Sequence, residues 1–258
     1  MGFVHYGRTA PIIKDEWYLK KIGDIYELLW LNMVKEAGWE ELNPEPKQIK
    51  IKNDVKLSRN LARARQKIFE LSYCNKWDWF FTGTLDPAKQ DRSNLSSFQK
   101  RFSQMIRDLK RLKGIKIDYL IIPELHADLT NWHCHGLLRG VPNDQLQTIN
   151  GQLSWKNYYN NFGFNDLGVI RSHEAVSKYL TKYVTKSIGS SRGVSEVGRC
   201  SYFHSQNLKT GEIIKKGSLQ GVNLCEQLGV TPLFENKYCK KYSLTPEAVE
   251  LISSSFIL

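Results

Sequence analysis

Three strand-like segments and one amphipathic helix follow one another in the middle of this chain, and their order is its strongest structural constraint. The strand-like segments are rich in aromatic and β-branched residues, and the helical segment has apolar residues three or four positions apart. The segments are, in order, a strand at residues 77–85, a helix at 95–112, and strands at 117–126 and 132–139. Strand, helix, strand, strand is the first half of a ferredoxin-like split unit. We therefore predict an α+β fold, in which helices pack on a ferredoxin-like or RRM-like antiparallel sheet.

The flanking sequence predicts further elements. Apolar residues at helical spacing predict a helix from Lys14 to Ala37, and Ser58 is a suitable N-cap for a second helix that ends near Tyr73. The remaining predicted elements are a short strand at 168–171, a helix at 172–187, and a hairpin of strands 201–208 and 212–216 around Lys209-Thr210-Gly211. The predicted domains are a helical N-terminal extension at 1–57, a main domain at 58–216 and an unassigned C-terminal tail at 217–258.

Several protein classes are excluded by what the 258 residues lack. No apolar run reaches the roughly 18 residues of a transmembrane helix, and the N-terminus lacks the apolar stretch of a signal peptide. The five cysteines form no Cys-x-x-Cys pair, which fits a reducing compartment. No P-loop sequence is present, which argues against a nucleotide-driven motor. We expect a soluble cytoplasmic protein that contacts no membrane.

Positive charge is concentrated in two segments. The net charge is +11 and the pI is about 9.3, values typical of polyanion-binding proteins. In residues 47–67 only Asp54 opposes the Lys and Arg residues, and in residues 97–116 only Asp108 does. A solvated surface would also explain such runs. The residues predicted to contact nucleic-acid phosphates are Arg59, Arg63 and Lys67 on one helix and Lys178 and Lys186 on another.

Two histidines in the strand at 132–139 form a candidate metal site. Side chains alternate along a strand, so His133 and His135 share one face, about 7 Å apart, and Cys134 points to the other. The preceding strand places Glu124 and His126 on one face, and these two compete as the third ligand. Two imidazoles and a carboxylate without a thiolate suit Mn²⁺ or Mg²⁺ better than structural Zn²⁺.

Two tyrosines one helical turn apart form the second candidate site. In the helix at 172–187, Tyr179 and Tyr183 lie between an apolar stripe and a stripe of lysines. Tyrosines at such a border are often packing residues. A phenol held there beside Lys182 can also act as a nucleophile on a phosphate.

These motifs together resemble the HUH endonuclease superfamily, and within it the rolling-circle replication initiators (Rep proteins) of phages, plasmids and integrated elements. Residues 80–85 resemble the first motif, Glu124–His126 with His133–His135 the second, and Tyr179–Lys182 with Tyr183 the third. The resemblance covers residues 58–208.

The resemblance implies an enzyme that nicks and rejoins single-stranded DNA. A divalent cation on His133, His135 and Glu124 would polarise the scissile phosphate. Tyr179 would attack it, giving a 5′-phosphotyrosine and a free 3′-OH, while Lys182 would stabilise the oxyanion. The implied partners are single-stranded or hairpin origin DNA and a host helicase.

The order of the two tyrosines is not set by spacing, because each has a lysine three residues on. We favour Tyr179 for the first attack, since it lies closer to the lysine stripe, and Tyr183 for the second transfer. An HUH transposase and a non-catalytic single-strand-binding module remain alternatives. A metal-dependent hydrolase without a covalent step needs more carboxylates, and a relaxase usually has its motifs in the reverse order.

Overall fold

The computed structural model describes residues 16–31, 61–126, 128, 130–189, 202–218, 229–236 and 239–255. Contacts divide the chain into two compact units. Unit 1 comprises residues 1–50 and 211–258, and unit 2 comprises residues 51–210. In sequence, unit 2 is therefore inserted between the two parts of unit 1. None of the helices described is long and apolar enough to cross a membrane.

Unit 2 is built on a five-stranded antiparallel sheet with the strand order β8-β3-β5-β4-β9. Its elements are β3 (Trp79–Thr84), α2 (Leu95–Lys113), β4 (Asp118–Leu125), β5 (Trp132–Arg139), η1 (Asn143–Gln145), β6 (Leu146–Ile149), β7 (Gln152–Trp155), α3 (Lys156–Asn161), β8 (Asn165–Val169), α4 (His173–Gly189) and β9 (Phe203–His204). β5 lies between β3 and β4, so it splits the β3–α2–β4 unit. The predicted α+β fold with helices on an antiparallel sheet is confirmed.

Helix α2 has local signals at both ends. The side chain of Asn94 accepts a hydrogen bond from the Ser97 amide at 2.9 Å, which caps the first turn. Gly114 ends the helix in the left-handed conformation, with φ of 67°. Between these ends, Phe98, Phe102 and Leu109 are the buried side chains. They fix which side of α2 meets the sheet.

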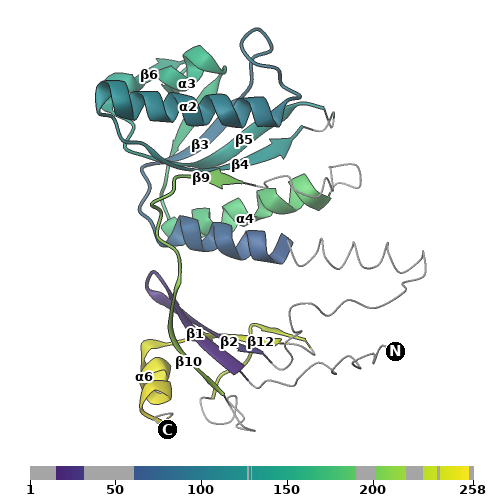
Figure 1. Ribbon diagram of the computed structural model, residues 1–258, viewed down its shortest axis with the longest axis vertical. Coiled ribbons are helices and arrows are strands. Elements are labelled where there is room, and N and C mark those ends of the chain that lie inside the picture. The colour runs from purple at the N-terminus through teal and green to yellow at the C-terminus, as the bar shows by residue number, and fades with distance from the viewer. Residues whose placement is uncertain are drawn as a thin grey trace, which may run out of the picture. The chain divides into compact units, whose positions relative to one another are not determined.

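Helices cover both faces of this sheet, as Figure 1 shows for α2 and α4. The first face packs on α2 and α3 through a largely aromatic core that includes Phe81, Phe102 and Tyr158. We call it the core face. The second face packs on α4 and on the helical residues 61–73. We call it the site face, because the candidate metal ligands lie on it. The start of the second predicted helix, at Ser58, lies outside the described residues.

A hairpin and a short helix are inserted between β5 and β8. β6 and β7 are joined by Asn150 and Gly151, with φ of 52° and 77°. Positive φ at both central residues is the requirement of a type I′ turn, and Asn-Gly is its preferred sequence. α3 follows directly after β7. β6, β7 and α3 are not among the elements predicted from the sequence.

Unit 1 is a second five-stranded antiparallel sheet, with the order β10-β1-β2-β12-β11. Its elements are β1 (Glu16–Ile22), β2 (Ile25–Leu31), β10 (Glu212–Ser218), β11 (Phe234–Glu235), β12 (Cys239–Leu244) and α6 (Pro246–Ser255). Trp17, Leu28, Tyr242 and Ile252 are buried together in its core. The described residues after 217, for which no structure was predicted, thus contribute two strands and a helix to this unit.

The predicted helical N-terminal extension is wrong for the residues described. Residues 16–31 form the β1–β2 hairpin, which turns at Gly23-Asp24 with φ of 62° at Gly23. The apolar residues Ile22, Ile25 and Leu28 fit a helical spacing, but they also fit two strands that reverse at a glycine. Pairing with β10 and β12 decides between the two.

The predicted hairpin around Lys209-Thr210-Gly211 is also wrong. β9 pairs with β4, while β10 pairs with β1 in the other sheet. Phe203 of β9 is buried in the core of unit 2. The two strands are thus separated by the junction between the units, where neither hydrogen-bonds to the other.

Candidate functional site

Strand alternation and register bring the candidate metal ligands together at one end of the site face. β5 points His133 and His135 to this face, whereas Cys134 is buried in the core face. In the antiparallel ladder, Glu124 of β4 lies directly opposite His133. Glu124 is 9% exposed and the two histidines are half-buried, so the three side chains are largely shielded from water.

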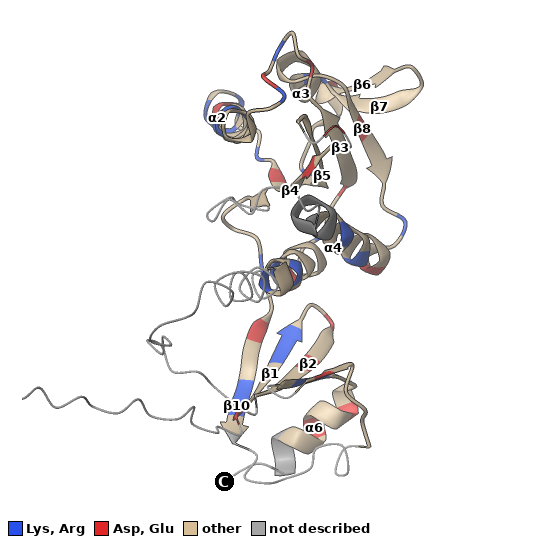
Figure 2. Ribbon diagram, turned by 90° about the vertical axis from the view of Figure 1, so that its right-hand side faces the viewer, with Lys and Arg blue, Asp and Glu red and all other residues tan. Residues whose placement is uncertain are grey.

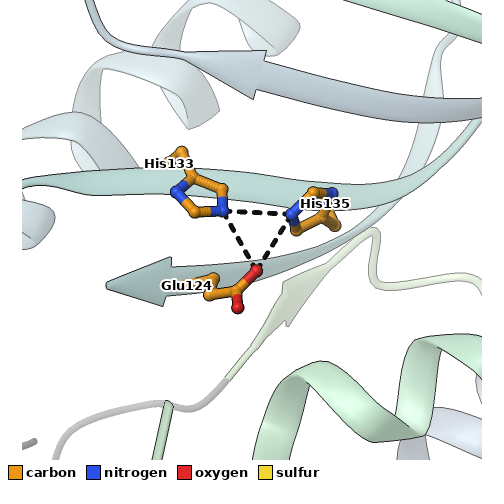
Figure 3. A group of neighbouring side chains, drawn as sticks. All are labelled: Glu124, His133 and His135. Atoms are coloured by element: carbon orange, nitrogen blue, oxygen red, sulfur yellow. Dashed lines mark hydrogen bonds and ion pairs between the residues drawn. The ribbon is translucent and has the colours of Figure 1, made fainter. Parts of the chain in front are cut away.

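The three ligand atoms form a tight triangle (Figure 3). Glu124 Oε2 lies 3.0 Å from the Nε2 atom of each histidine, and the two Nε2 atoms are 3.1 Å apart. Two ligands about 2.1 Å from one cation, at right angles, are separated by about 3.0 Å. The triangle therefore fits one face of an octahedral site, the geometry that Mg²⁺ and Mn²⁺ prefer with O and N ligands.

His126, the competing third ligand, is not part of this triangle. Its ring packs edge-on against the His133 ring, with centroids 4.2 Å apart. The grouped ligand atoms come from Glu124, His133 and His135 alone among the described residues. Register explains the difference, because Glu124 pairs directly with His133 while His126 lies beyond the end of β4.

Thr82 of β3 contacts His135 from the side of β5 that lies opposite β4. It lies opposite His135 in the β3–β5 ladder, and its Oγ1 is 3.3 Å from His135 Nδ1. A hydrogen bond at the second ring nitrogen fixes the tautomer and orientation of a ligating histidine. Thr82 is not among the predicted site residues, although strand alternation in Thr-Gly-Thr places Thr82 and Thr84 on one face.

Helix α4 carries both tyrosines to the same place. The Tyr183 ring stacks on the His135 ring, with centroids 3.9 Å apart and planes at 21°. The Tyr183 hydroxyl donates a hydrogen bond of 2.6 Å to the Tyr179 oxygen. Tyr183 is 6% exposed and belongs to the site-face core, whereas Tyr179 is 44% exposed. Phe80, which was not predicted as a site residue, lies beside Tyr179 and His135, with ring centroids 5.8 and 6.2 Å away.

The electrostatics of the two tyrosines differ. Burial raises the pKa of the Tyr183 phenol well above its usual range, and the neighbouring Tyr179 hydroxyl and Glu124 add to the shift. Lys182 is exposed and its ammonium lies 5.8 Å from the centre of the Tyr179 ring. Lys178 forms an ion pair with Glu174 one turn earlier. A buried neutral phenol thus lies beside an exposed phenol with a lysine next to it.

The predicted phosphate-contacting residues are only partly within the described structure. Arg63 and Lys178 are exposed and Lys67 is half-buried, whereas Arg59 and the side chain of Lys186 lie outside the described residues. Figure 2 shows Lys and Arg along α2 and α4.

Residues 78–188 match the model of the family described as replication-associated protein ORF2/G2P. This span runs from β3 into α4 and includes the triangle and both tyrosines. Comparisons with curated proteins and with solved structures gave no match. The match points to a role in replication, and hence to DNA as the partner.

Proposed function

We propose that this protein is a rolling-circle replication initiator of the HUH superfamily, which nicks and rejoins single-stranded DNA through a 5′-phosphotyrosine. One observation carries the proposal. The Tyr183 ring stacks on the candidate ligand His135, and its hydroxyl lies 2.6 Å from that of the exposed Tyr179. A solvent-accessible phenol therefore lies next to residues that can hold a cation.

Each residue has a distinct role in this proposal. Glu124, His133 and His135 would hold Mn²⁺ or Mg²⁺, which when bound supplies Lewis-acid polarisation of phosphate oxygens. The Tyr179 phenol loses its proton as its oxygen attacks phosphorus, the bond from phosphorus to the 3′ oxygen breaks, and one proton is taken up by that leaving oxygen to give the 3′-OH. The hydrogen bond from Tyr183 stabilises negative charge on the Tyr179 oxygen.

Rejoining is the reverse of the same transfer. The tyrosyl phosphodiester keeps the energy of the broken bond, so attack by a 3′-OH restores the DNA without ATP. Lys182, beside the Tyr179 ring, offsets the charge that develops on the phosphate. Arg59, Arg63, Lys67, Lys178 and Lys186 are proposed to contact backbone phosphates of single-stranded or hairpin origin DNA. A helicase that opens the duplex stays an expectation from the family resemblance.

The test is a search for the covalent adduct. Labelled single-stranded DNA that covers the replicon's origin is incubated with the protein and Mn²⁺, and adducts that resist SDS are analysed by mass spectrometry. We expect an adduct on Tyr179 that is lost in Tyr179→Phe and retained in Tyr183→Phe. Tyr73→Phe, which removes a phenol hydroxyl elsewhere in unit 2, is the matched control and should behave as wild type.

Other products identify the alternatives. Cleaved DNA with a free 5′-phosphate and no adduct indicates a hydrolase and contradicts the proposal. Binding without cleavage indicates a non-catalytic module. An adduct that is transferred into unrelated DNA, rather than to the 3′-OH of its own strand, indicates a transposase. An adduct found mainly on Tyr183 reverses the proposed order of the two tyrosines.

A further inference from the structure

A surface pocket of about 330 Å³ lies in unit 2 at the end of β3. Its walls come from three parts of the chain: the loop after β3, the turn of the β6–β7 hairpin, and the region of α3 up to the start of β8. The residues that line it are Thr84, Leu85, Asp86, Pro87, Lys89, Ile149, Asn150, Tyr159, Gly163 and Phe164.

Sheet register places one wall residue of this pocket, Thr84, next to the metal-ligand triangle. Thr84, on its wall, pairs directly with His133 and lies on the site face. Directly paired residues on antiparallel strands have Cβ atoms about 4.5–5.5 Å apart. Both the amide and the hydroxyl of Thr84 donate to the Phe164 carbonyl oxygen, at 2.9 and 3.0 Å. Phe164, Thr84, His133 and Glu124 thus form one row across neighbouring strands.

The aromatic residues of this region fall into two groups. Trp155, Tyr158 and Phe162 are buried on the core face. Tyr159 and Phe164 are half-buried, line the pocket, and contribute to none of the hydrophobic core clusters found among the described residues. Two aromatic rings in a surface pocket, outside the core, are the arrangement that stacks unpaired bases.

The polar groups of the pocket suit the edge of a base. The Asp86 carboxylate and the exposed Asn150 offer hydrogen-bond acceptors and donors. The Lys89 ammonium lies 4.6 Å from the centre of the Tyr159 ring and donates to the Tyr159 carbonyl oxygen at 2.8 Å. One carboxylate and one lysine leave no excess of positive charge, which fits a base better than a phosphate.

We propose that this pocket binds one unpaired nucleobase of the DNA strand, close to the phosphate held at the triangle. The inference rests on the proposed function, because it assumes that a single strand crosses the site face. Bound there, the base fixes the register of the strand, so the pocket selects which phosphate reaches Tyr179.

The test uses single-stranded oligo(dT) that carries 5-bromodeoxyuridine, in EDTA, so that no cleavage occurs. We expect photo-crosslinks to map to Tyr159 or Phe164. Because stacking on one aromatic residue contributes about 1–3 kcal/mol per base, Phe164→Ala should weaken binding by about 5- to 150-fold. Phe164→Trp keeps a stacking ring and should restore affinity. Phe234→Ala, which removes an exposed ring from unit 1, is the matched control.

If Phe164→Ala and Phe234→Ala bind oligo(dT) with equal affinity, the proposed base pocket is wrong, wherever the crosslinks map. A loss in Phe164→Ala that Phe164→Trp does not restore overturns it too, because the loss then does not depend on a ring. Failure of the proposed function is separate: it is the absence of an adduct with Mn²⁺ in a wild-type protein that still binds oligo(dT) in EDTA.

Discussion

The two faces of the unit 2 sheet use the same strands for different purposes. The core face is mostly apolar and carries nine buried aromatic side chains of the core cluster, among them Phe81 and Phe102. The site face is apolar around Leu120 and Leu137, but it is polar at the end of the same strands where Glu124, His133 and His135 lie. The candidate metal ligands thus occupy one end of one face, and packing over the rest of the sheet holds them in place.

The largest loss of stability should come from a substitution that leaves a cavity in the core face. Phe102 is fully buried, and Phe102→Ala should lower the free energy of unfolding by about 3–5 kcal/mol, through lost burial and the cavity left behind. Urea denaturation followed by circular dichroism measures this loss. The fraction that stays folded should still bind Mn²⁺. A loss below about 1 kcal/mol would show that the core face does not carry the stability of unit 2.

The next largest effect should be the gain in stability when Mn²⁺ binds the candidate ligands on the site face. Mn²⁺ at about a hundred times its dissociation constant should stabilise the wild-type protein by about 2.7 kcal/mol, because it binds only the folded state. Glu124→Gln should remove this gain. Asp108→Asn, an acid-to-amide change on α2, should keep it. Thermal unfolding with Mn²⁺ and with EDTA decides, and equal gains in all three proteins contradict the assignment of Glu124.

Two glycines of the same sheet sharpen the contrast on a smaller scale. A Cβ on Gly83 would lie 2.5 Å from the Tyr158 hydroxyl and 2.6 Å from the Phe81 ring, inside the packed core. A Cβ on Gly168 would meet only Phe80 atoms, at 3.8 Å or more. We expect Gly83→Ala to cost about 1–3 kcal/mol and Gly168→Ala to be close to neutral. Similar melting temperatures for the two variants would mean that the core yields more easily than its packing indicates.

The smallest expected effect is on the reactivity of the Cys134 thiol, which lies between the two histidines in sequence. Burial raises the pKa of the Cys134 thiol to about 12. Iodoacetamide at pH 8 should therefore leave Cys134 unmodified in the folded protein and label it after unfolding. The unfolded thiol, with a pKa of about 8.5, ionises first, so stability should fall as pH rises from there towards about 12. Rapid labelling of Cys134 in the folded state would contradict the close packing of the core face.

Local patterns predicted the parts of the site that depend on one element. The alternation of His133, Cys134 and His135 needs only the period of a strand, and the 95–112 helix needs only its apolar spacing. The choice between Glu124 and His126 needs the β4–β5 register, which spacing does not contain. The stacking of Tyr183 on His135 joins a helix to a strand far away in sequence, so no local pattern could predict it.

The errors have a related cause. Ile22, Ile25 and Leu28 fit a helical period, and this spacing predicts a helix over residues 16–31, but Gly23-Asp24 is a turn signal that divides the segment into two strands. β1 and β2 find their other partners in β10 and β12, at the opposite end of the sequence. Strand pairings between residues far apart in sequence thus decide whether this segment forms a helix or two strands.

Because unit 1 is formed from two separate parts of the sequence, the two units become able to fold at different times during synthesis. β2 lies between β1 and β12, so this sheet is incomplete until residue 244 has been synthesised. A lone two-stranded hairpin is at best marginally stable in water. All of unit 2 has by then been synthesised, and domains generally fold as units while synthesis proceeds. We therefore expect unit 2 to fold first, while the outer edges of the β1–β2 hairpin stay unpaired until β10 and β12 have been synthesised.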